Sequence, residues 1–254
     1  MGFFEAFMSN KERVVTGFAL LGAILLIGFI NNFFIMWLVL GVVYLIAFQE
    51  AQKLFGIKNE KLILYAVGMW LLAGVYPYGD DLFILAGVAY AGAVAFDKKL
   101  EWKTFLPFIY PTAGMLFILT MYQDYGVLSL LWLLVIVAMT DVGAYTVGKN
   151  IGKTPFCETS PNKTMEGVVG GIVVATLSGA FVGLGIVDFG VSFFISAFVA
   201  ISSIFGDLFE SYLKRKAGVK DSGDILPGHG GILDRTDGYL FGAIVMLILL
   251  RGLV

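Results

Sequence analysis

The sequence has 254 residues, of which 59% are hydrophobic and 14% are charged, and its formal net charge is −2. Soluble domains average about 25% charged residues, so this composition excludes an ordinary soluble protein. Crossing a hydrocarbon core about 30 Å thick takes roughly 20 apolar residues in a helix, and the long unbroken apolar runs favour helices over barrel strands. The fold class predicted is an all-α polytopic membrane protein.

Apolar runs recur along the whole chain, and each is a candidate membrane span. They cover residues 14–30, 33–48, 61–76, 82–96, 104–121, 127–148, 167–187, 190–213 and 238–253. Only Asn31 and Asn32 separate the first two runs, which predicts either a tight hairpin or a partly re-entrant pair. The N-terminal segment is amphipathic and lacks the cleavage pattern of a signal peptide, so we expect it to be retained. A single cysteine, Cys157, excludes an internal disulfide.

Basic residues alternate between the connections. Lys and Arg number two before the first run, then none, three, none, three, none, three, none and five, with Arg251 alone near the end. Cytoplasmic loops of membrane proteins carry an excess of Lys and Arg. The alternation therefore predicts about nine transmembrane helices, with the N-terminus in the cytoplasm and the C-terminus outside.

The two halves of the chain differ in where their ionisable and small residues lie. Residues 1–126 are predicted to be N-terminal transmembrane helices that act as a scaffold, because no acid or base lies inside their apolar runs. Residues 127–254 are predicted to be a catalytic transmembrane region. Small residues are frequent in the stretch 167–185, where close helix packing in lipid is a better explanation than ligand binding. No internal repeat supports an inverted-repeat transporter.

The longest polar interval is residues 211–237, which contains the only histidine. Just before and within it, acidic and basic side chains alternate at helical spacing: Asp207, Glu210, Ser211 and Lys214 share one helix face. Carboxylates at membrane depth usually face a cavity or a partner. Interhelical salt bridges explain any one of them. Their density favours a site for a magnesium-bound polyphosphate, because Asp221, Asp224, Asp234 and Asp237 follow.

Glycines surround the histidine in this interval. Gly228, Gly230 and Gly231 allow a tight backbone path whose amides can point at phosphate oxygens, although a merely flexible loop is the alternative. His229 is expected either to donate a hydrogen bond to phosphate or to have a structural role.

A second polar loop, SPNKTMEG at 160–167, leads into the seventh apolar run. Ser160, Lys163, Thr164 and Glu166 suggest an anion site at a helix N-terminus. A capping arrangement explains the spacing of Lys163 and Glu166 equally well.

These motifs together resemble the signature of the phosphatidate cytidylyltransferases, also called CDP-diacylglycerol synthases. DVGAYTVGKNIGK, which begins at Asp141, and the 160–167 loop resemble two further elements of that family, with Asn162 and Met165 as departures. The resemblance covers about residues 138–240. Its strongest part consists of Ser211, Lys214, Arg215, Lys220, Asp221, Pro227, His229, Gly230, Gly231, Asp234, Arg235 and Asp237.

The resemblance implies transfer of a cytidylyl group from CTP to phosphatidate, with pyrophosphate released and CDP-diacylglycerol formed. It implies Mg²⁺, leaves a second cation such as K⁺ open, and implies Asp207 and Asp234, then Asp221 and Asp237, as metal ligands. The predicted catalytic residues are Asp207, Lys214, Arg215, Lys220, Asp221, His229, Asp234, Arg235 and Asp237. The predicted substrate-binding residues are Asp141, Ser160, Lys163, Thr164, Glu166, Glu210, Ser211, Gly230 and Gly231.

The expected partners are CTP, phosphatidate and membrane lipid, with a homodimer and no nucleic acid. The expected location is a bacterial cytoplasmic (inner) membrane, with the site facing the cytoplasm. The alternatives are an enzyme that uses CTP on another lipid and an ion-coupled transporter. A transporter relay should place its acids near mid-span, whereas these acids lie at helix ends beside basic loops.

Overall fold

The computed structural model describes residues 3–254, and the side chains from residue 15 onward. Every predicted apolar run falls on a helix, which confirms the all-α class. The helices are α1 (Phe3–Ile30), α2 (Phe33–Leu54), α3 (Leu62–Ala73), α4 (Asp81–Phe96), α5 (Ala113–Tyr125), α6 (Val127–Ile151), α7 (Met165–Val182), α8 (Phe189–Ala217) and α9 (Leu233–Leu253). Short helical turns lie at Trp102–Phe105, Phe108–Thr112 and Gly183–Gly185.

Six helical segments of the described chain are long and apolar enough to cross a membrane. The remaining apolar helices, Val15–Ile30, Leu62–Ala73 and Asp81–Phe96, are shorter. The chain is thus a polytopic membrane protein, and the count of nine spans stays a prediction.

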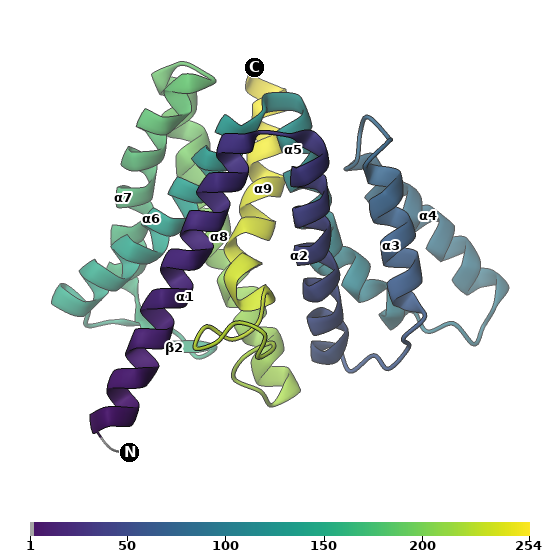
Figure 1. Cartoon of the computed structure of the whole chain (residues 1–254), viewed down its shortest axis with the longest axis horizontal. Coiled ribbons are helices and arrows are strands. Elements are labelled where there is room, and N and C mark those ends of the chain that lie inside the picture. The colour runs from purple at the N-terminus through teal and green to yellow at the C-terminus, as the bar shows by residue number, and fades with distance from the viewer. Residues whose placement is uncertain (1–2) are drawn as a thin grey trace.

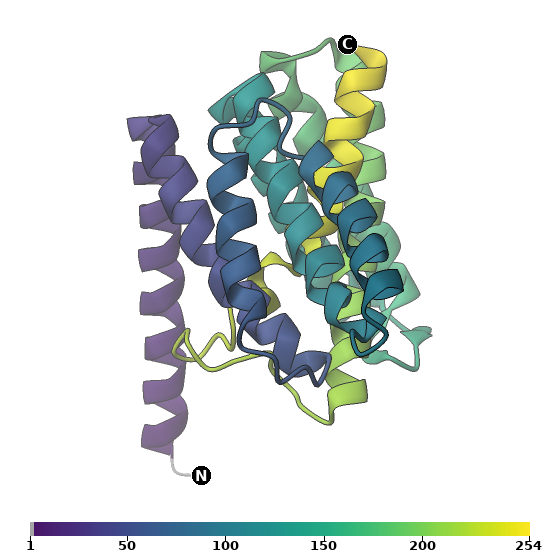
Figure 2. The same ribbon diagram turned by 90° about the vertical axis from the view of Figure 1, so that its right-hand side faces the viewer.

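The helices run alternately up and down the bundle. The connections that contain basic residues, at 55–61, 97–101, 152–164 and 218–232, lie at the lower end of Figure 1, together with the start of α1. The C-terminus lies at the opposite end, and the turned view in Figure 2 agrees. This alternation matches the predicted pattern of loops, while the side of the membrane that each end faces stays a prediction.

The turn between the first two helices is a tight hairpin. Asn31 has a positive φ of 45°, and the Asn32 side chain caps α2 by accepting a hydrogen bond from the amide of Ile35. The two indole rings of Trp37 and Trp70 then join α2 to α3, because each donates to the backbone carbonyl of the other residue at 3.1–3.2 Å.

Helices α6 to α9 form the tightly packed part of the bundle. A Cβ atom on Gly171 would lie 2.6 Å from the carbonyl oxygen of Thr140, and one on Gly179 would lie 2.5 Å from Oγ of Ser196. Backbones this close tolerate only the smallest residues. The packing role predicted for the small residues of α7 is therefore confirmed.

The last helix is fixed at its far end by charge. Arg251 donates to Asp80 at the start of α4, at 2.6 and 3.2 Å, and to Asp124 in α5 at 3.0 Å. Asp80 is 8% exposed, so this contact ties the C-terminal turn of α9 to the N-terminal half.

The boundaries of α8 and α9 differ from those predicted. α8 continues to Ala217, where Gly218 closes it in the left-handed conformation with φ 72°, and α9 begins at Leu233, five residues before the predicted run. Hydropathy cannot detect these polar turns. The difference places Asp234 and Asp237 on a helix, where their directions are fixed.

Candidate active site

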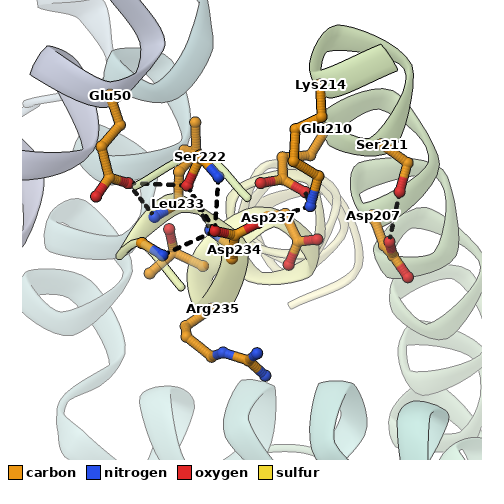
Figure 3. Close-up of polar contacts among 12 residues, drawn as sticks. Glu50, Asp207, Glu210, Ser211, Lys214, Ser222, Leu233, Asp234, Arg235 and Asp237 are labelled. Atoms are coloured by element: carbon orange, nitrogen blue, oxygen red, sulfur yellow. Dashed lines mark hydrogen bonds and ion pairs between the residues drawn. The ribbon is translucent and has the colours of Figure 1, made fainter. Parts of the chain in front are cut away.

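A cavity of about 480 Å³ opens at the lower end of the bundle, between α6, α8 and α9. Most of the predicted acids and two predicted bases meet there (Figure 3). Its lining comprises Val137, Ala138, Asp141, Ser203, Asp207, Glu210, Lys214, Asp221, Asp234, Arg235, Asp237, Gly238 and Tyr239. Figure 3 shows six of these residues, Asp207, Glu210, Lys214, Asp234, Arg235 and Asp237.

Lys214 is the central cation of this cavity. Its Nζ lies 2.6 Å from Oδ1 of Asp234 and 2.5 Å from Oε2 of Glu210. The contact with Glu210 is an ion pair outside hydrogen-bond geometry, and Oε1 of this buried glutamate has no hydrogen-bond partner in the described part of the chain. Lys214 therefore joins the end of α8 to the start of α9.

Asp234 uses its other oxygen to hold the loop that precedes it. Its Oδ2 accepts hydrogen bonds from the amide of Ser222 at 2.8 Å, the hydroxyl of Ser222 at 2.9 Å and the amide of Gly231 at 2.8 Å. Both oxygens are thus engaged by donors from the protein. The predicted role of Asp234 as a metal ligand competes with these contacts.

Glu50, near the end of α2, holds the loop beside the cavity and is absent from the residues predicted from the sequence. It is 4% exposed, and it accepts hydrogen bonds from the amides of Ile232 and Leu233 at 3.1 and 2.7 Å. Its Oε2 also lies 3.1 Å from Ser222 Oγ, whose one proton can be donated either to Glu50 or to Asp234. Figure 3 shows Glu50 reaching this loop from another part of the bundle. A lone acid after an apolar run carries no signal of contacts more than 170 residues away.

Lys163 reaches the cavity from a β-hairpin between α6 and α7. The hairpin pairs β1 (Pro155–Cys157) with β2 (Ser160–Thr164) in antiparallel register. Lys163 forms an ion pair with Asp207, which also accepts a 3.3 Å hydrogen bond from Ser211. The structure thus brings Lys163 of the predicted anion loop against the predicted helix face of Asp207 and Ser211.

The other residues of the 160–167 loop make structural contacts. Thr164 caps α7 by accepting from the amide of Gly167 at 3.2 Å. Glu166 accepts hydrogen bonds from the amides of Lys153 and Thr154 and from the Thr154 hydroxyl. Ser160 pairs with Cys157 at the hairpin turn. Contacts of these three residues with substrate stay a prediction.

Several predicted residues lie outside the cavity lining. Arg215 and Lys220 are exposed at the end of α8 and in the following loop. The His229 ring lies beside α1, where a Cβ atom on Gly17 would be 3.9 Å from its Nε2, and the His229 carbonyl accepts from Arg235 Nε at 3.0 Å. Their contacts with phosphate stay predictions.

Gly230 and Gly231 shape the loop. Gly230 adopts φ 79°, which side-chain-bearing residues rarely do, and its amide neighbour Gly231 donates to Asp234. The glycines here serve the internal geometry of the loop, and a contact of their backbone with phosphate stays a prediction.

The donor set suits Mg²⁺. Acids outnumber bases in the cavity lining, with Asp141, Asp207, Glu210, Asp221, Asp234 and Asp237 against Lys214 and Arg235. An anionic nucleotide would be repelled from this cavity without added cations. In the described part of the chain, no group of three or more acidic, histidine or cysteine side chains is placed so that it could hold a metal ion by itself. Mg²⁺ is usually held by one or two carboxylates plus water and substrate phosphates, so the residues fit such a site.

Comparison with known proteins decides the family. The sequence model described as "Cytidylyltransferase family" matches residues 11–253. The chain belongs to this family. It is 43% identical to the phosphatidate cytidylyltransferase of Helicobacter pylori (strain ATCC 700392 / 26695) over 97% of this chain and 94% of that protein. The proteins of the same name from Thermotoga maritima and Bacillus subtilis are 38% and 35% identical, over 67% and 77% of this chain and 68% of each relative.

Membership confirms the resemblance seen in the sequence and makes the chain an enzyme of the nucleotidyltransferase class. The family match extends over nearly all helices, including those of the N-terminal half. It removes the transporter alternative, and the named relatives place the chain among bacterial membrane enzymes.

Proposed function

We propose that this enzyme transfers a cytidylyl group from CTP to phosphatidate in a Mg²⁺-dependent reaction, giving CDP-diacylglycerol and pyrophosphate. The observation that carries the proposal is a charged cavity at one end of a bundle of membrane-length helices, in a chain 43% identical to a protein named for this reaction. In such a cavity a lipid phosphate and a soluble nucleotide can meet.

In the proposed reaction, a phosphate oxygen of phosphatidate forms a bond to the α-phosphorus of CTP. The bond from that phosphorus to the bridging oxygen of the β-phosphate breaks, and this oxygen leaves with pyrophosphate. The attacking phosphate is already ionised near neutral pH, so no general base is required. Catalysis then depends on positioning and on neutralising charge.

The basic side chains supply part of this neutralisation. Lys214 and Arg235 line the cavity, and Lys163 lies at its mouth against Asp207. We assign them to phosphate oxygens of the two substrates, with Lys214 nearest the acids of α8 and α9. Asp141 completes the wall formed by α6.

Asp207 and Asp237, with Asp221, are the residues that would hold Mg²⁺. Bound there, the ion would neutralise phosphate charge that the basic residues leave uncompensated. Asp237 lines the cavity, and within the described part of the chain its carboxylate accepts a single hydrogen bond, from the amide of Gly238 to Oδ1 at 2.8 Å. A monovalent cation such as K⁺ is a further component to be tested by omission.

We further propose that the cavity faces the cytoplasm of a bacterial inner membrane. Sixteen of the 17 basic residues belong to the predicted cytoplasmic connections and helix ends, which supports this orientation. The homodimer implied by the family resemblance is testable by light scattering on the purified protein in detergent.

The decisive experiment measures pyrophosphate release by the solubilised protein with CTP, Mg²⁺ and phosphatidate, and omits each component in turn. We expect strict dependence on all three, with CDP-diacylglycerol as the lipid product. Turnover with another lipid phosphate but not with phosphatidate would refute the proposed acceptor. Activity that persists in chelator would refute the metal requirement.

A further inference from the structure

Glu50 binds the chain at the point where α9 begins. Its Oε1 accepts from the amide of Ile232 at 3.1 Å, and its Oε2 accepts from the amide of Leu233 at 2.7 Å. Among the side chains that the structure describes, no Lys or Arg forms an ion pair with Glu50. The backbone of α9 is therefore its main electrostatic partner.

This arrangement replaces an ordinary helix cap. The first amides of a helix lack partners within the helix, and the N-terminus favours a negative charge. Ile232 occupies the cap position of α9 and offers no side-chain hydrogen bond. Glu50 supplies that missing acceptor from α2, so the polar first turn of α9 depends on a residue of the N-terminal half.

The same carboxylate is connected to the cavity through one hydroxyl. Ser222 Oγ lies 3.1 Å from Glu50 Oε2 and 2.9 Å from Asp234 Oδ2, and Asp234 in turn holds Lys214 at 2.6 Å. Figure 3 shows this chain of contacts from Glu50 to Lys214. A displacement of the loop at Ser222 would thus also shift Asp234 and, through it, Lys214.

The loop closes tightly around Glu50. A Cβ atom on Gly223 or Gly231 would lie 2.5 or 2.6 Å from a carboxylate oxygen of Glu50, which leaves no room for a side chain at either position. The backbone just after Ser222 and just before Ile232 therefore lies close against this carboxylate. A flexible loop would not need such a fit.

We propose that Glu50 is a positioning residue for cytidylyl transfer: it fixes the 218–232 loop and the first turn of α9 so that Asp234 keeps Lys214 at the cavity. Glu50 is absent from the cavity lining and acts through Ser222 and the backbone. The inference rests on the proposed function for its effect on turnover. Its effect on the loop requires no substrate.

The first test compares Glu50→Gln with a matched control, Asp188→Asn. Asp188 also binds two helix amides, those of Gly190 and Val191 at 2.9 and 3.2 Å, but at the start of α8. We expect Glu50→Gln to lower kcat by roughly 10-fold or more while KM for CTP changes little, because hydrogen bonds to a charged group are lost. Glu50→Asp keeps the charge and should recover part of the loss, and Asp188→Asn should keep the wild-type kcat.

The second test measures the loop directly by native-state trypsin cleavage in detergent. Arg215 and Lys216 are exposed in the last turn of α8, and Lys220 is exposed in the loop that follows. Lys98 and Lys99 are exposed in the connection after α4. We expect Glu50→Gln to raise the cleavage rate at 215–220 severalfold relative to that at 98–99, and Asp188→Asn to leave the ratio unchanged.

The outcomes separate the two proposals. Wild-type protein that makes no CDP-diacylglycerol would refute the proposed function, while the cleavage ratio would still decide the role of Glu50. Glu50→Gln with unchanged kcat and an unchanged ratio would overturn the positioning role, even if its melting temperature fell. If Glu50→Gln does not fold, Ser222→Ala takes its place, and full kcat in folded Ser222→Ala protein would overturn the inference.

Discussion

Lys214 and Asp234, twenty residues apart, are joined by a 2.6 Å charge-assisted hydrogen bond that connects the end of α8 to the first turn of α9. Lys214 also contacts Glu210, so one ammonium group is the counter-ion for two acids that are almost completely buried. The shape and the charge of the cavity therefore depend on the same side chain.

Replacement of this lysine should be more harmful than its exposure suggests. Lys214→Gln leaves two buried carboxylates without a cation, and breaking a buried pair in this way costs about 3–5 kcal/mol. We expect both a lower melting temperature and at least a 100-fold loss of pyrophosphate release. Lys216→Gln, two residues away on the exposed side of α8, should behave as wild type. Equal behaviour of the two variants would contradict the central role of Lys214.

The hairpin lysine is expected to matter through its charge at the cavity mouth. Lys163→Ala removes the partner of Asp207 and should reduce kcat/KM roughly 10-fold to 100-fold, because charge-assisted contacts to phosphate are strong. Lys153→Ala, in the segment just before the hairpin, provides the control, since within the described part of the chain Lys153 makes a hydrogen bond through its backbone amide alone, to Glu166. Steady-state kinetics with CTP as the varied substrate measures the difference, and equal values for both variants would exclude a role for Lys163.

A Mg²⁺ titration should distinguish the aspartates that bind the metal from Asp234. Asp207→Asn and Asp237→Asn are expected to raise the Mg²⁺ concentration needed for half-maximal rate, since these carboxylates line the cavity. Asp234→Asn should abolish most turnover, because Asp234 would no longer bind Lys214 or hold the loop through Ser222 and Gly231. The residual rate should keep the wild-type Mg²⁺ dependence. A large shift for Asp234→Asn alone would instead identify it as the principal ligand.

A methyl group at Gly231 should disturb the site. Its Cβ would lie within 2.6 Å of Ser222 Oγ and of both carboxylate oxygens of Glu50, so these side chains or the loop must shift and their hydrogen bonds are disturbed. We expect Gly231→Ala to lower kcat by roughly 5-fold to 150-fold, which corresponds to an overpacking cost of about 1–3 kcal/mol. Gly68→Ala in α3 has open space around its Cβ and should keep full activity. Wild-type turnover by Gly231→Ala would show that the loop adapts without cost.

Loss of the Arg251 contacts at the far end of the bundle should lower stability and leave activity unchanged. Arg251→Gln removes the contacts with Asp80 and Asp124, and because the Arg251 side chain is 36% exposed, solvent screening limits the loss to about 1 kcal/mol. A decrease of about 2–4 °C in melting temperature follows for a chain of this size. Activity below the melting transition should be unchanged, and a selective loss of kcat would contradict this separation of roles.

The all-α class and the order of the helices were predictable from the sequence because apolar runs and basic loops each leave a direct signal. So was much of the site. The spacing of Asp207, Glu210, Ser211 and Lys214 on one face of a helix is a local property, and the structure places all four at or beside the cavity.

The rest could not be predicted, because it depends on contacts between distant segments. Glu50 follows an apolar run and resembles an ordinary interfacial acid in the sequence, yet it caps α9 more than 180 residues later. The early start of α9 has the same cause, since the amides of its polar first turn find their acceptors in Glu50 and Ser222, which belong to other segments. Likewise, spacing left the roles of Thr164 and Glu166 open, and both make contacts within the hairpin region.

The two attachments of α9 also restrict how the enzyme can move. Glu50 and Lys214 hold its first turn, and Arg251 holds its last turn to Asp80 and Asp124. A rigid-body tilt of this helix would have to break charge-assisted contacts at one end or the other. Widening of the cavity to admit a lipid is easier at the hairpin, where the Lys163 and Asp207 side chains are each more than a quarter exposed. We therefore expect α9 to stay in place during turnover and the hairpin to move when the cavity widens.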